Sequence, residues 1–337
     1  MVAGSGRFAA LMRTPGDPAI ELAEGFTSRV VGRTGERVGG LTWHQAPDDG
    51  ACFADGDGWI YVSNSEIPLL GGVSALRFGP DGSIRSGYRI LSGTDSNRAG
   101  GATSWNTWLS CEDTGRGRVF ECDPYGHFAA MPRLAMGLFR HESAVCDEAG
   151  QVVYLTEDHP EGCFYRFRPD DWGDLTTGVL EVMVGSGAGK VTWTRVPNPA
   201  ATDAPTRDQV EGAVRFERAG RCSTSGGFCY FSTDDDRVWS YDPAAGELSV
   251  LYGADPRLLA GAGDLFVTRD GGINIIGDDG AVTPLLRVGG PEKTITGLAF
   301  SPDGERLYFS SRAGGVTYEV TGPFKGSEGA EAALRGR

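Results

Sequence analysis

One pattern of apolar and polar positions recurs six times along the chain. In each copy an apolar, often aromatic, pair is followed by a small residue and a polar step, and further strand-like phrases precede and follow it. The copies are Tyr61-Val62-Ser63, Trp108-Leu109-Ser110, Tyr154-Leu155-Thr156, Tyr230-Phe231-Ser232, Ile275-Ile276-Gly277 and Tyr308-Phe309-Ser310. Linked strands that repeat every ~35–50 residues are typical of β-propeller blades. The sequence therefore predicts an all-β fold, a six-bladed β-propeller closed into a single ring.

The two ends and one irregular spacing refine this organisation. Residues 1–25 are interpreted as an N-terminal arm, 26–324 as the propeller and 325–337 as a C-terminal tail. The strand-like segment 26–32 is expected to complete the last blade, which would leave no open sheet edge. Residues 178–185 and 190–197 supply outer strands of the third blade, and the Pro/Ala-rich segment 197–209 is a candidate lid.

Composition limits the classes of partner and the cell compartment. A net charge of −14 argues against nucleic-acid binding and is compatible with binding a hard cation such as calcium. The apolar run 8–12 is too short for a secretory signal and nothing resembles a membrane span, so a cytoplasmic protein is expected. Most of the seven cysteines are expected to be buried free thiols, with one disulfide as the alternative.

Known catalytic motifs are missing or incomplete. The GSGAGK phrase at 185–190 has Val184 and Val191 where a phosphate-binding loop needs Gly and Ser or Thr, so we expect a hairpin turn there. The sequence contains no G-x-S-x-G, H-E-x-x-H or C-x-x-C motif. Zinc chemistry and α/β-hydrolase chemistry therefore have no support.

Carboxylates recur at corresponding places in successive blades. They follow the second strand of each predicted blade, at 66, 112–113, 157–158 and 234, while Glu142 and Asp264 lie near the start of innermost strands. Innermost strands begin around the channel, so these groups converge, and either a cation or an arginine has to balance their charge. The predicted metal ligands are Glu66, Glu112, Glu142, Glu157 and Asp264, with calcium as the candidate ion.

Cationic and aromatic residues accompany these carboxylates at the channel mouth. They suit a small anionic ligand. The predicted catalytic residues are Glu142 and His141, as acid or base, and Arg98, which would stabilise an oxyanion. The predicted substrate-binding residues are Arg221, His44, Trp43, Trp105 and Arg312.

Several long phrases resemble the PhoX family of alkaline phosphatases, and the resemblance spans roughly residues 25–324. The closest phrases are AGGATSWNTWLSCED at 99–113, FRHESAV with VVYLTED within 139–158, and FSPDGERLYFSSRAGGVTYEVTGPF at 300–324. The resemblance implies a six-bladed propeller that hydrolyses phosphomonoesters with an iron–calcium cluster in its channel. In such a site the metals would polarise the phosphoryl group.

The chain departs from the family pattern at the metal positions. Arg98 stands where the family has a cysteine that ligates iron, and Ala219-Gly220 stands where it has a glutamate-bearing motif. Gly263-Asp264 replaces an Asp-Asn pair. An arginine cannot ligate iron and repels a neighbouring metal. We therefore expect no complete iron–calcium cluster, although one calcium ion could remain.

Three functions are open at this point. The first is a hydrolase of small phosphate or other esters. The second is a metal-independent enzyme of specialised metabolism, a cyclase, lyase or isomerase, that uses Glu142 or His141 with Arg98. The third is a non-catalytic ligand-binding propeller. Fold alone does not separate them, and the ionisable residues at the channel mouth favour an enzyme.

Overall fold

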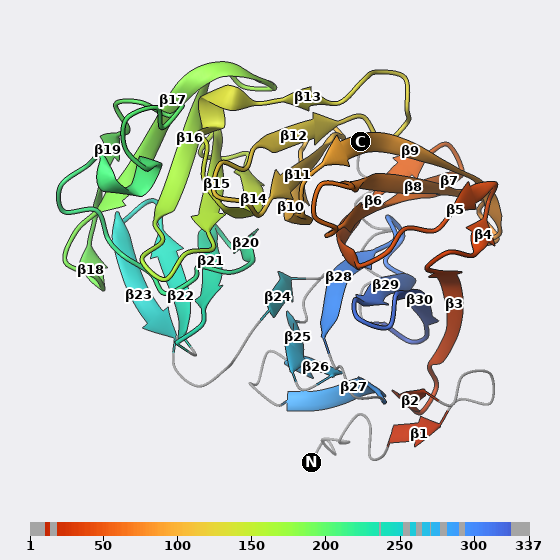
Figure 1. The fold of residues 1–337 in the computed structure, drawn as a ribbon. Coiled ribbons are helices and arrows are strands. Elements are labelled where there is room, and N and C mark those ends of the chain that lie inside the picture. Colours follow the sequence, from red (N-terminus) through yellow and green to blue (C-terminus); the bar gives the residue numbers. More distant parts are fainter. Residues whose placement is uncertain are drawn as a thin grey trace, which may run out of the picture.

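The computed structural model describes residues 11–13, 19–235, 237–251, 257–260, 265–269, 271–276, 282–289 and 294–324. Six antiparallel sheets surround a central axis, as Figure 1 shows, and each forms one blade. The described part of the chain contains no α-helix, only the 3₁₀ turns η1 (Leu134–Met136) and η2 (Thr206–Asp208). The predicted six-bladed β-propeller is confirmed.

Each blade runs outward from a first strand that lines the channel. Blades one to three comprise β6 (Pro47–Asp55), β7 (Gly58–Ser65), β8 (Gly71–Phe78) and β9 (Ile84–Thr94); β10 (Asn97–Ala102), β11 (Trp108–Glu112), β12 (Val119–Cys122) and β13 (Met131–Pro132); and β14 (His141–Asp147), β15 (Val152–Glu157), β16 (Phe164–Asp171), β17 (Asp174–Val184) and β19 (Thr192–Arg195).

Blades four to six follow the same order. They comprise β20 (Cys222–Ser225), β21 (Phe228–Thr233), β22 (Arg237–Asp242) and β23 (Glu247–Leu251); β24 (Arg257–Ala260), β25 (Leu265–Arg269), β26 (Gly272–Ile276) and β27 (Val282–Val288); and β28 (Ile295–Phe300), β29 (Arg306–Ser311) and β30 (Val316–Thr321).

The N-terminal part of the chain closes the ring and also extends one blade. Strand β3 (Thr27–Arg33) pairs with β30 as the outer strand of blade six, as the sequence predicts, and β28 lies against β6 of blade one. The structure differs from the expected N-terminal arm, because β2 (Ile20–Ala23) pairs with β27 of blade five and β1 (Leu11–Arg13) pairs with β2. A short hairpin of β4 (Arg37–Val38) and β5 (Leu41–Thr42) follows β3.

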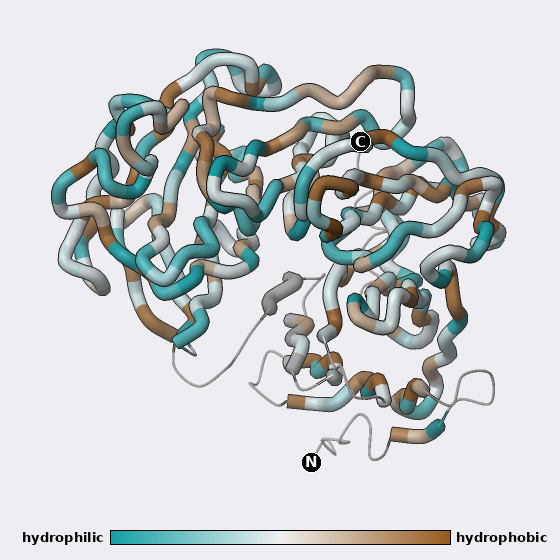
Figure 2. The backbone as a smooth tube through the Cα atoms, in the orientation of Figure 1, coloured by the Kyte–Doolittle hydropathy of each residue, from teal (hydrophilic) through white to brown (hydrophobic). Residues whose placement is uncertain are grey.

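The hydrophobic core lies between neighbouring blades. One cluster joins blades one and two through Ile60, Val62 and Trp108, and others join blades two and three, three and four, five and six, and six and one. Figure 2 shows hydrophobic and hydrophilic residues alternating along the blades, as strands buried against neighbouring sheets require. No helix among the described residues is long and apolar enough to span a membrane. All seven cysteines are free thiols, which leaves no disulfide.

Two irregular segments of blade three have distinct structures. The segment 185–191 is the predicted hairpin between β17 and β19, and within it β18 (Gly189–Lys190) pairs with β23 of blade four. Segment 197–209 is tied down by Arg116, which donates to the carbonyls of Ala200 and Ala201, and by a hydrogen bond from Leu138 to Pro199. None of its residues is among those that line the cavities of about 440 and 280 Å³ in the channel, and its role as a lid stays a prediction.

Candidate active site in the channel

The end of the second strand occupies the same place in five blades. The residues there are Glu66, Asp113, Asp158, Asp234 and Arg312, and each backbone N–H donates to a carbonyl shortly before the first strand of its own blade, at 2.9–3.2 Å. This repeated bond holds one side chain per blade at the mouth of the channel. The predicted recurrence of charged groups at corresponding positions is therefore real.

The first strands present their charged residues on local irregularities of the sheet. The pairing register shifts between Pro47 and Gly50, between Asn97 and Gly100, and between His141 and Ser143. Bulges of this kind redirect side chains and are common beside active sites. Here they carry Asp48-Asp49, Arg98 and Glu142, respectively. The bulge at Arg98 is held from blade one, because the Asn64 amide donates to the carbonyls of Arg98 and Ala99 at 2.9 and 3.1 Å.

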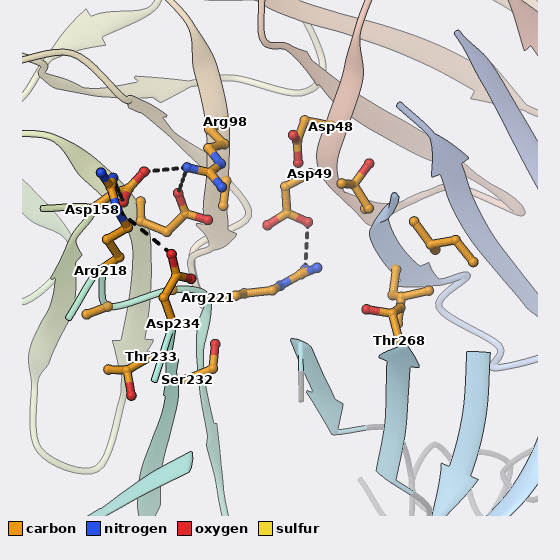
Figure 3. A pocket seen from close by; sticks show the side chains of 18 residues that line it. Asp48, Asp49, Arg98, Asp158, Arg218, Arg221, Ser232, Thr233, Asp234 and Thr268 are labelled. Atoms are coloured by element: carbon orange, nitrogen blue, oxygen red, sulfur yellow. Dashed lines mark hydrogen bonds and ion pairs between the residues drawn. The ribbon is translucent and has the colours of Figure 1, made fainter. Parts of the chain in front are cut away.

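These residues surround a polar cavity of about 440 Å³ in the channel (Figure 3). Its charged and hydroxyl-bearing lining consists of Asp48, Asp49, Arg98, Glu142, Asp158, Arg218, Arg221, Ser232, Thr233, Asp234, Thr268 and Thr296. A second cavity of about 280 Å³ continues along the same strands. On β10, for example, the lining passes from Arg98 to the small residues 100–102. Arg221 is the one charged residue that lines this second cavity, and it lines both.

Arg98 lies at the centre of a carboxylate cluster between blades two and three. Its Nη1 is 2.6 Å from Asp158 Oδ2, 3.0 Å from Glu142 Oε2 and 3.1 Å from Asp113 Oδ2. The Glu142 carboxylate raises the pKa of Arg98 although burial opposes it, and Asp48, Asp158 and Asp113 act in the same direction as Glu142. The guanidinium is therefore a permanent positive charge among three acids.

The aspartates of this cluster are shifted in opposite directions. Burial raises the pKa of Asp113, and the neighbouring Asp158 charge adds to the rise against the effect of Arg98. Burial also acts to raise the pKa of Asp158, but Arg98 and Arg218 outweigh it and hold that pKa below its ordinary value. Groups of like chemistry whose pKa values are pushed apart are suited to divide acid and base roles.

A second group of ion pairs lies across the channel. Figure 3 shows Arg221, from the start of blade four, extending toward Asp49 of blade one, and the Nη2–Oδ1 distance is 2.6 Å. Arg312 of blade six pairs with Glu66 and lies 3.5 Å from Asp48 Oδ2. Burial, followed by the Glu66 charge, raises the pKa of Asp48 well above its ordinary value. Asp48 therefore keeps its proton at a higher pH than a solvent-exposed aspartate.

Three buried carboxylates have the geometry to hold a metal ion. Ligand oxygens of Asp113, Glu142 and Asp158 lie within 4.8 Å of one another. Arg98 Nη1, however, already lies within 3.1 Å of an oxygen of each. Since a guanidinium has no lone pair to donate and carries a positive charge, these residues as arranged do not fit an iron–calcium cluster.

Two of the predicted metal ligands turn away from the channel. Glu112 is bound by Arg118, with Nε 2.8 Å from Oε2, and by the backbone N–H of Asp95. Glu157 is fully buried and accepts hydrogen bonds from Arg207 and Tyr165, both at 2.9 Å. The prediction that these two glutamates are metal ligands is wrong, because their oxygens bind within the blades.

Both histidines of the predicted site are also buried away from the channel cavity. His141 bonds through Nε2 to the Gly137 carbonyl at 3.1 Å and packs against the tilted ring of Phe139, and burial lowers its pKa to about 4. His44 lies between the hydroxyls of Ser74 and Ser63, and burial lowers its pKa to about 3. The prediction of His141 as acid or base is wrong, as is that of His44 as a substrate contact.

The predicted tryptophans belong to the packing of the blades. Trp43 is buried between blades one and six and donates to Thr317 Oγ1 at 3.1 Å. Trp105 donates to Glu121 at 2.8 Å and packs edge-to-face on Trp172. Neither lines the cavity, so neither contacts a ligand there. Asp264 lies outside the described residues.

Glu142, Arg98 and Arg221 do line the cavity, Glu66 and Arg312 join it through their ion pairs, and the roles of these residues stay predictions. Sequence reasoning missed Asp48, Asp49, Asp113, Asp158 and Arg218 as site residues. A signal for two of them existed. Asp113 and Asp158 each follow a glutamate at the end of a strand, and neighbouring strand residues face opposite ways.

Comparisons with known proteins agree with this architecture. The sequence model of the family described as "Alkaline phosphatase PhoX" matches residues 71–267, more than half of the chain. A solved structure described as a "putative gluconolactonase" is similar with a TM-score of 0.54 and 14% identity, over 89% of this chain and 93% of that one. The WD40 β-propeller domain of Doa1 is similar with a TM-score of 0.50 and 10% identity, over 87% and 97%. These two likenesses show the propeller fold alone. No curated protein matches the sequence.

Proposed function

The chain belongs to the PhoX family of alkaline phosphatases, and on this premise we propose that it is a hydrolase of small anionic esters, phosphate monoesters first, that acts in the channel. The observation that carries the proposal is the 440 Å³ cavity, where arginines and carboxylates with displaced pKa values meet. A family built for phosphate esters and a cavity rich in guanidinium groups point to the same class of substrate.

The anionic group of the substrate would bind between Arg218 and Arg221. Both line the cavity, and the side chain of Arg218 is 42% exposed and so accessible from it. Each already pairs with a carboxylate, Asp158 at 3.0 Å and Asp49 at 2.6 Å, so the substrate shares these guanidinium groups with the protein. Sharing holds the arginines in place before the substrate arrives, which lowers the cost of ordering them.

Two carboxyl groups of the cavity would carry the proton transfers. Glu142 accepts a proton from the attacking water as that water's oxygen bonds to phosphorus or to the ester carbon. The bond to the leaving alcohol oxygen breaks, and Asp48 protonates that oxygen. Asp48 suits the acid role because burial raises its pKa, and general acid–base catalysis of this kind contributes about 10²–10⁴-fold to the rate.

The second cavity offers space for the alcohol part of the ester. Apart from Arg221 its lining carries no charged side chain, and small residues such as Gly101, Ala102 and Ser223 dominate it. An apolar alcohol group fits such a space better than a charged one. An Ala102→Leu variant would then raise KM for bulky esters and leave small esters unaffected.

The test is turnover of p-nitrophenyl phosphate and p-nitrophenyl acetate by the purified chain. We expect Glu142→Gln to lower kcat about 10²-fold and Arg221→Ala chiefly to raise KM. Arg168→Ala is the matched control, because Arg168 pairs with Glu181 on the outside of blade three and Arg166 remains there. Unchanged kinetics in the two channel variants would move the site elsewhere.

A second candidate is a metal-independent lyase, isomerase or cyclase that acts in the same cavity. The observation that favours it is the position of Arg98. Its Nη1 lies within 3.1 Å of oxygens from three carboxylates, in the place that the ion of a metal-dependent hydrolase would take. Absence of ester turnover, together with saturable binding of small anions that Arg221→Ala abolishes, would favour this candidate or a non-catalytic binding propeller.

A further inference from the structure

The carboxylate triad of Asp113, Glu142 and Asp158 shares a single nitrogen of Arg98. Their three oxygens lie 2.6–3.1 Å from Nη1, a spacing that resembles ligands around an ion. We propose that Arg98 is the resident cation of this triad, and that removing its guanidinium turns the triad into a calcium site. The inference goes beyond the proposed hydrolysis, because it concerns which cation the site accepts and not which bond is cleaved.

The triad does not depend on Arg98 for its arrangement. The outer oxygen of Asp113 is held by Arg140 Nε at 2.9 Å, and the outer oxygen of Asp158 by Arg218 Nη1 at 3.0 Å. The backbone N–H groups of Asp113 and Asp158 donate to the carbonyls of Ser96 and Arg140, both at 3.0 Å. Two of the inner oxygens therefore keep their places when Arg98 is replaced by a smaller side chain.

Charge balance explains why the natural chain would reject a metal. The three carboxylates of the triad face the guanidinium groups of Arg98, Arg140 and Arg218, and two further carboxylates, Glu66 and Asp234, lie 3.9 Å from Arg98 and Arg218, respectively. A divalent ion would have to displace Arg98 or lie against it, and like charges in a buried place repel strongly. Without Arg98 the carboxylates around the triad outnumber the guanidinium groups further, and the three oxygens that converge there are hard ligands that suit calcium.

The position of Arg98 is built into the backbone. It lies on the bulged start of β10, and the side chain of Asn64 fixes the carbonyls of the bulge. The small residues Gly100, Gly101 and Ala102 follow Arg98 along the strand and offer the guanidinium no polar side chain. Its polar partners therefore lie at the mouth of the channel. Arg98 is thus held at one place, as a bound ion would be.

The experiment is calorimetric titration of CaCl₂ into the full chain after dialysis against a chelator. We expect no saturable binding by the natural protein, and one calcium ion bound by Arg98→Ala with a Kd on the order of 10⁻⁴ M. The double variant Arg98→Ala/Asp158→Asn should lose that binding. Arg306→Ala is the control for loss of a positive charge, because Arg306 pairs with Glu319 in blade six, where Arg29 also remains.

Stability provides a second measurement that needs no activity. Calcium should raise the melting temperature of Arg98→Ala by several degrees and leave that of the natural chain unchanged. If Arg98→Ala does not fold, Arg98→Gln removes the charge while keeping an amide donor, and the same calcium response is expected. Arg98→Lys keeps the charge and should bind no calcium.

Two results would overturn the inference. One is a single calcium ion bound by the natural chain and lost in Asp158→Asn, which would show that Arg98 does not exclude the metal. The other is a folded Arg98→Ala or Arg98→Gln protein that binds no calcium. Loss of ester turnover alone affects the proposed function and not this inference, since both readouts here are calcium binding and melting temperature.

Discussion

At three places in blades two and three, the side chains of neighbouring residues point to opposite sides, one into the blade and one into the channel. Glu112 and Glu157 bind inside the blades, whereas the next residues, Asp113 and Asp158, face Arg98 in the channel. At the start of β14, His141 packs on Phe139 and its neighbour Glu142 faces the same arginine. Both residues of each pair lie at the channel end of a strand. Because successive side chains of a strand point to opposite sides, one residue packs inside the blade and its neighbour faces the cavity.

The two sets also differ in how their charges are satisfied. Glu157 is fully buried, and its two oxygens accept from Arg207, Tyr165 and the Cys163 backbone, so it anchors segment 197–209 to blade three. Asp158 shares Arg98 with two other carboxylates and pairs with the half-exposed Arg218. A group with dedicated partners stabilises the fold, and a group with shared partners can exchange them for a ligand.

The largest effect is expected from Glu157→Gln. The fully buried Glu157 side chain would lose its charge, and the partly buried Arg207 would keep a charge with no carboxylate beside it, so we expect the free energy of unfolding to fall by about 3 kcal/mol. Urea denaturation followed by tryptophan fluorescence measures this. Calcium response of the Arg98→Ala background should be unaffected, and a loss of less than about 1 kcal/mol would contradict the anchoring role.

The next effect concerns pH and His141. The folded protein holds this histidine neutral with a pKa of about 4, against 6.5 when unfolded. Below pH 6.5 His141 binds a proton in the unfolded chain but stays neutral in the folded chain, so the free energy of unfolding falls as pH drops toward 4. Over the first 1.5 pH units the loss is about 2 kcal/mol, and His141→Gln should remove that part of the slope.

The control for this measurement is the surface histidine His127. Its replacement by glutamine is the same substitution at an exposed position outside the core. His44 contributes a similar slope because burial also lowers its pKa. A slope unchanged in His141→Gln would show that His141 does not titrate as its buried position requires.

A smaller loss is expected from Asp158→Asn. Arg98 keeps Asp113 and Glu142, and the Arg218 side chain is 42% exposed, so neither arginine is left buried and alone. We expect a loss of about 1 kcal/mol, well below that of Glu157→Gln, in the same urea titration. The variant also leaves the cluster more positive, so inorganic phosphate should bind more tightly. A loss as large as that of Glu157→Gln would erase the distinction between the two positions.

The smallest effect, opposite in sign, is expected from Asp48→Asn. The folded state raises the pKa of Asp48 above its ordinary 3.8, so the folded chain holds a proton that the unfolded chain releases, and stability falls as pH rises through that range. Asparagine has no such penalty and should stabilise the protein at pH 8 by up to about 1 kcal/mol. The gain should vanish below pH 3.8. A variant less stable than the natural chain at pH 8 would contradict the raised pKa.

Much of the architecture could be predicted because it repeats. The aromatic pairs at Tyr61, Trp108 and Tyr308 recur at blade spacing, and their burial between blades made that repeat necessary. The closing strand β3 was predictable for another reason, because without it the last blade would keep an open sheet edge. Strands β1 and β2 were not, because they carry no copy of the repeat and pair only with the outer edge of blade five.

The candidate site was predictable only in part. Glu142, Arg98 and Arg221 were identified because they start first strands, which converge in any propeller. Trp43 and His44 were wrongly predicted to contact the substrate. In a sequence, an aromatic residue before a strand looks the same whether it packs in the core or contacts a ligand. The bulges that turn Asp48 and Asp49 inward depend on pairing register, which a single strand does not show.

By itself, therefore, the sequence determined that six similar units bury apolar faces against one another and bring charged strand ends to a common axis. Only the tertiary structure decided which charge meets which. The Glu112–Asp113 and Glu157–Asp158 pairs have near-identical local sequences, and bulge, twist and contacts with other blades set the direction of each side chain. Electrostatic pairing acts over a few ångströms, and those distances exist only once the ring has closed.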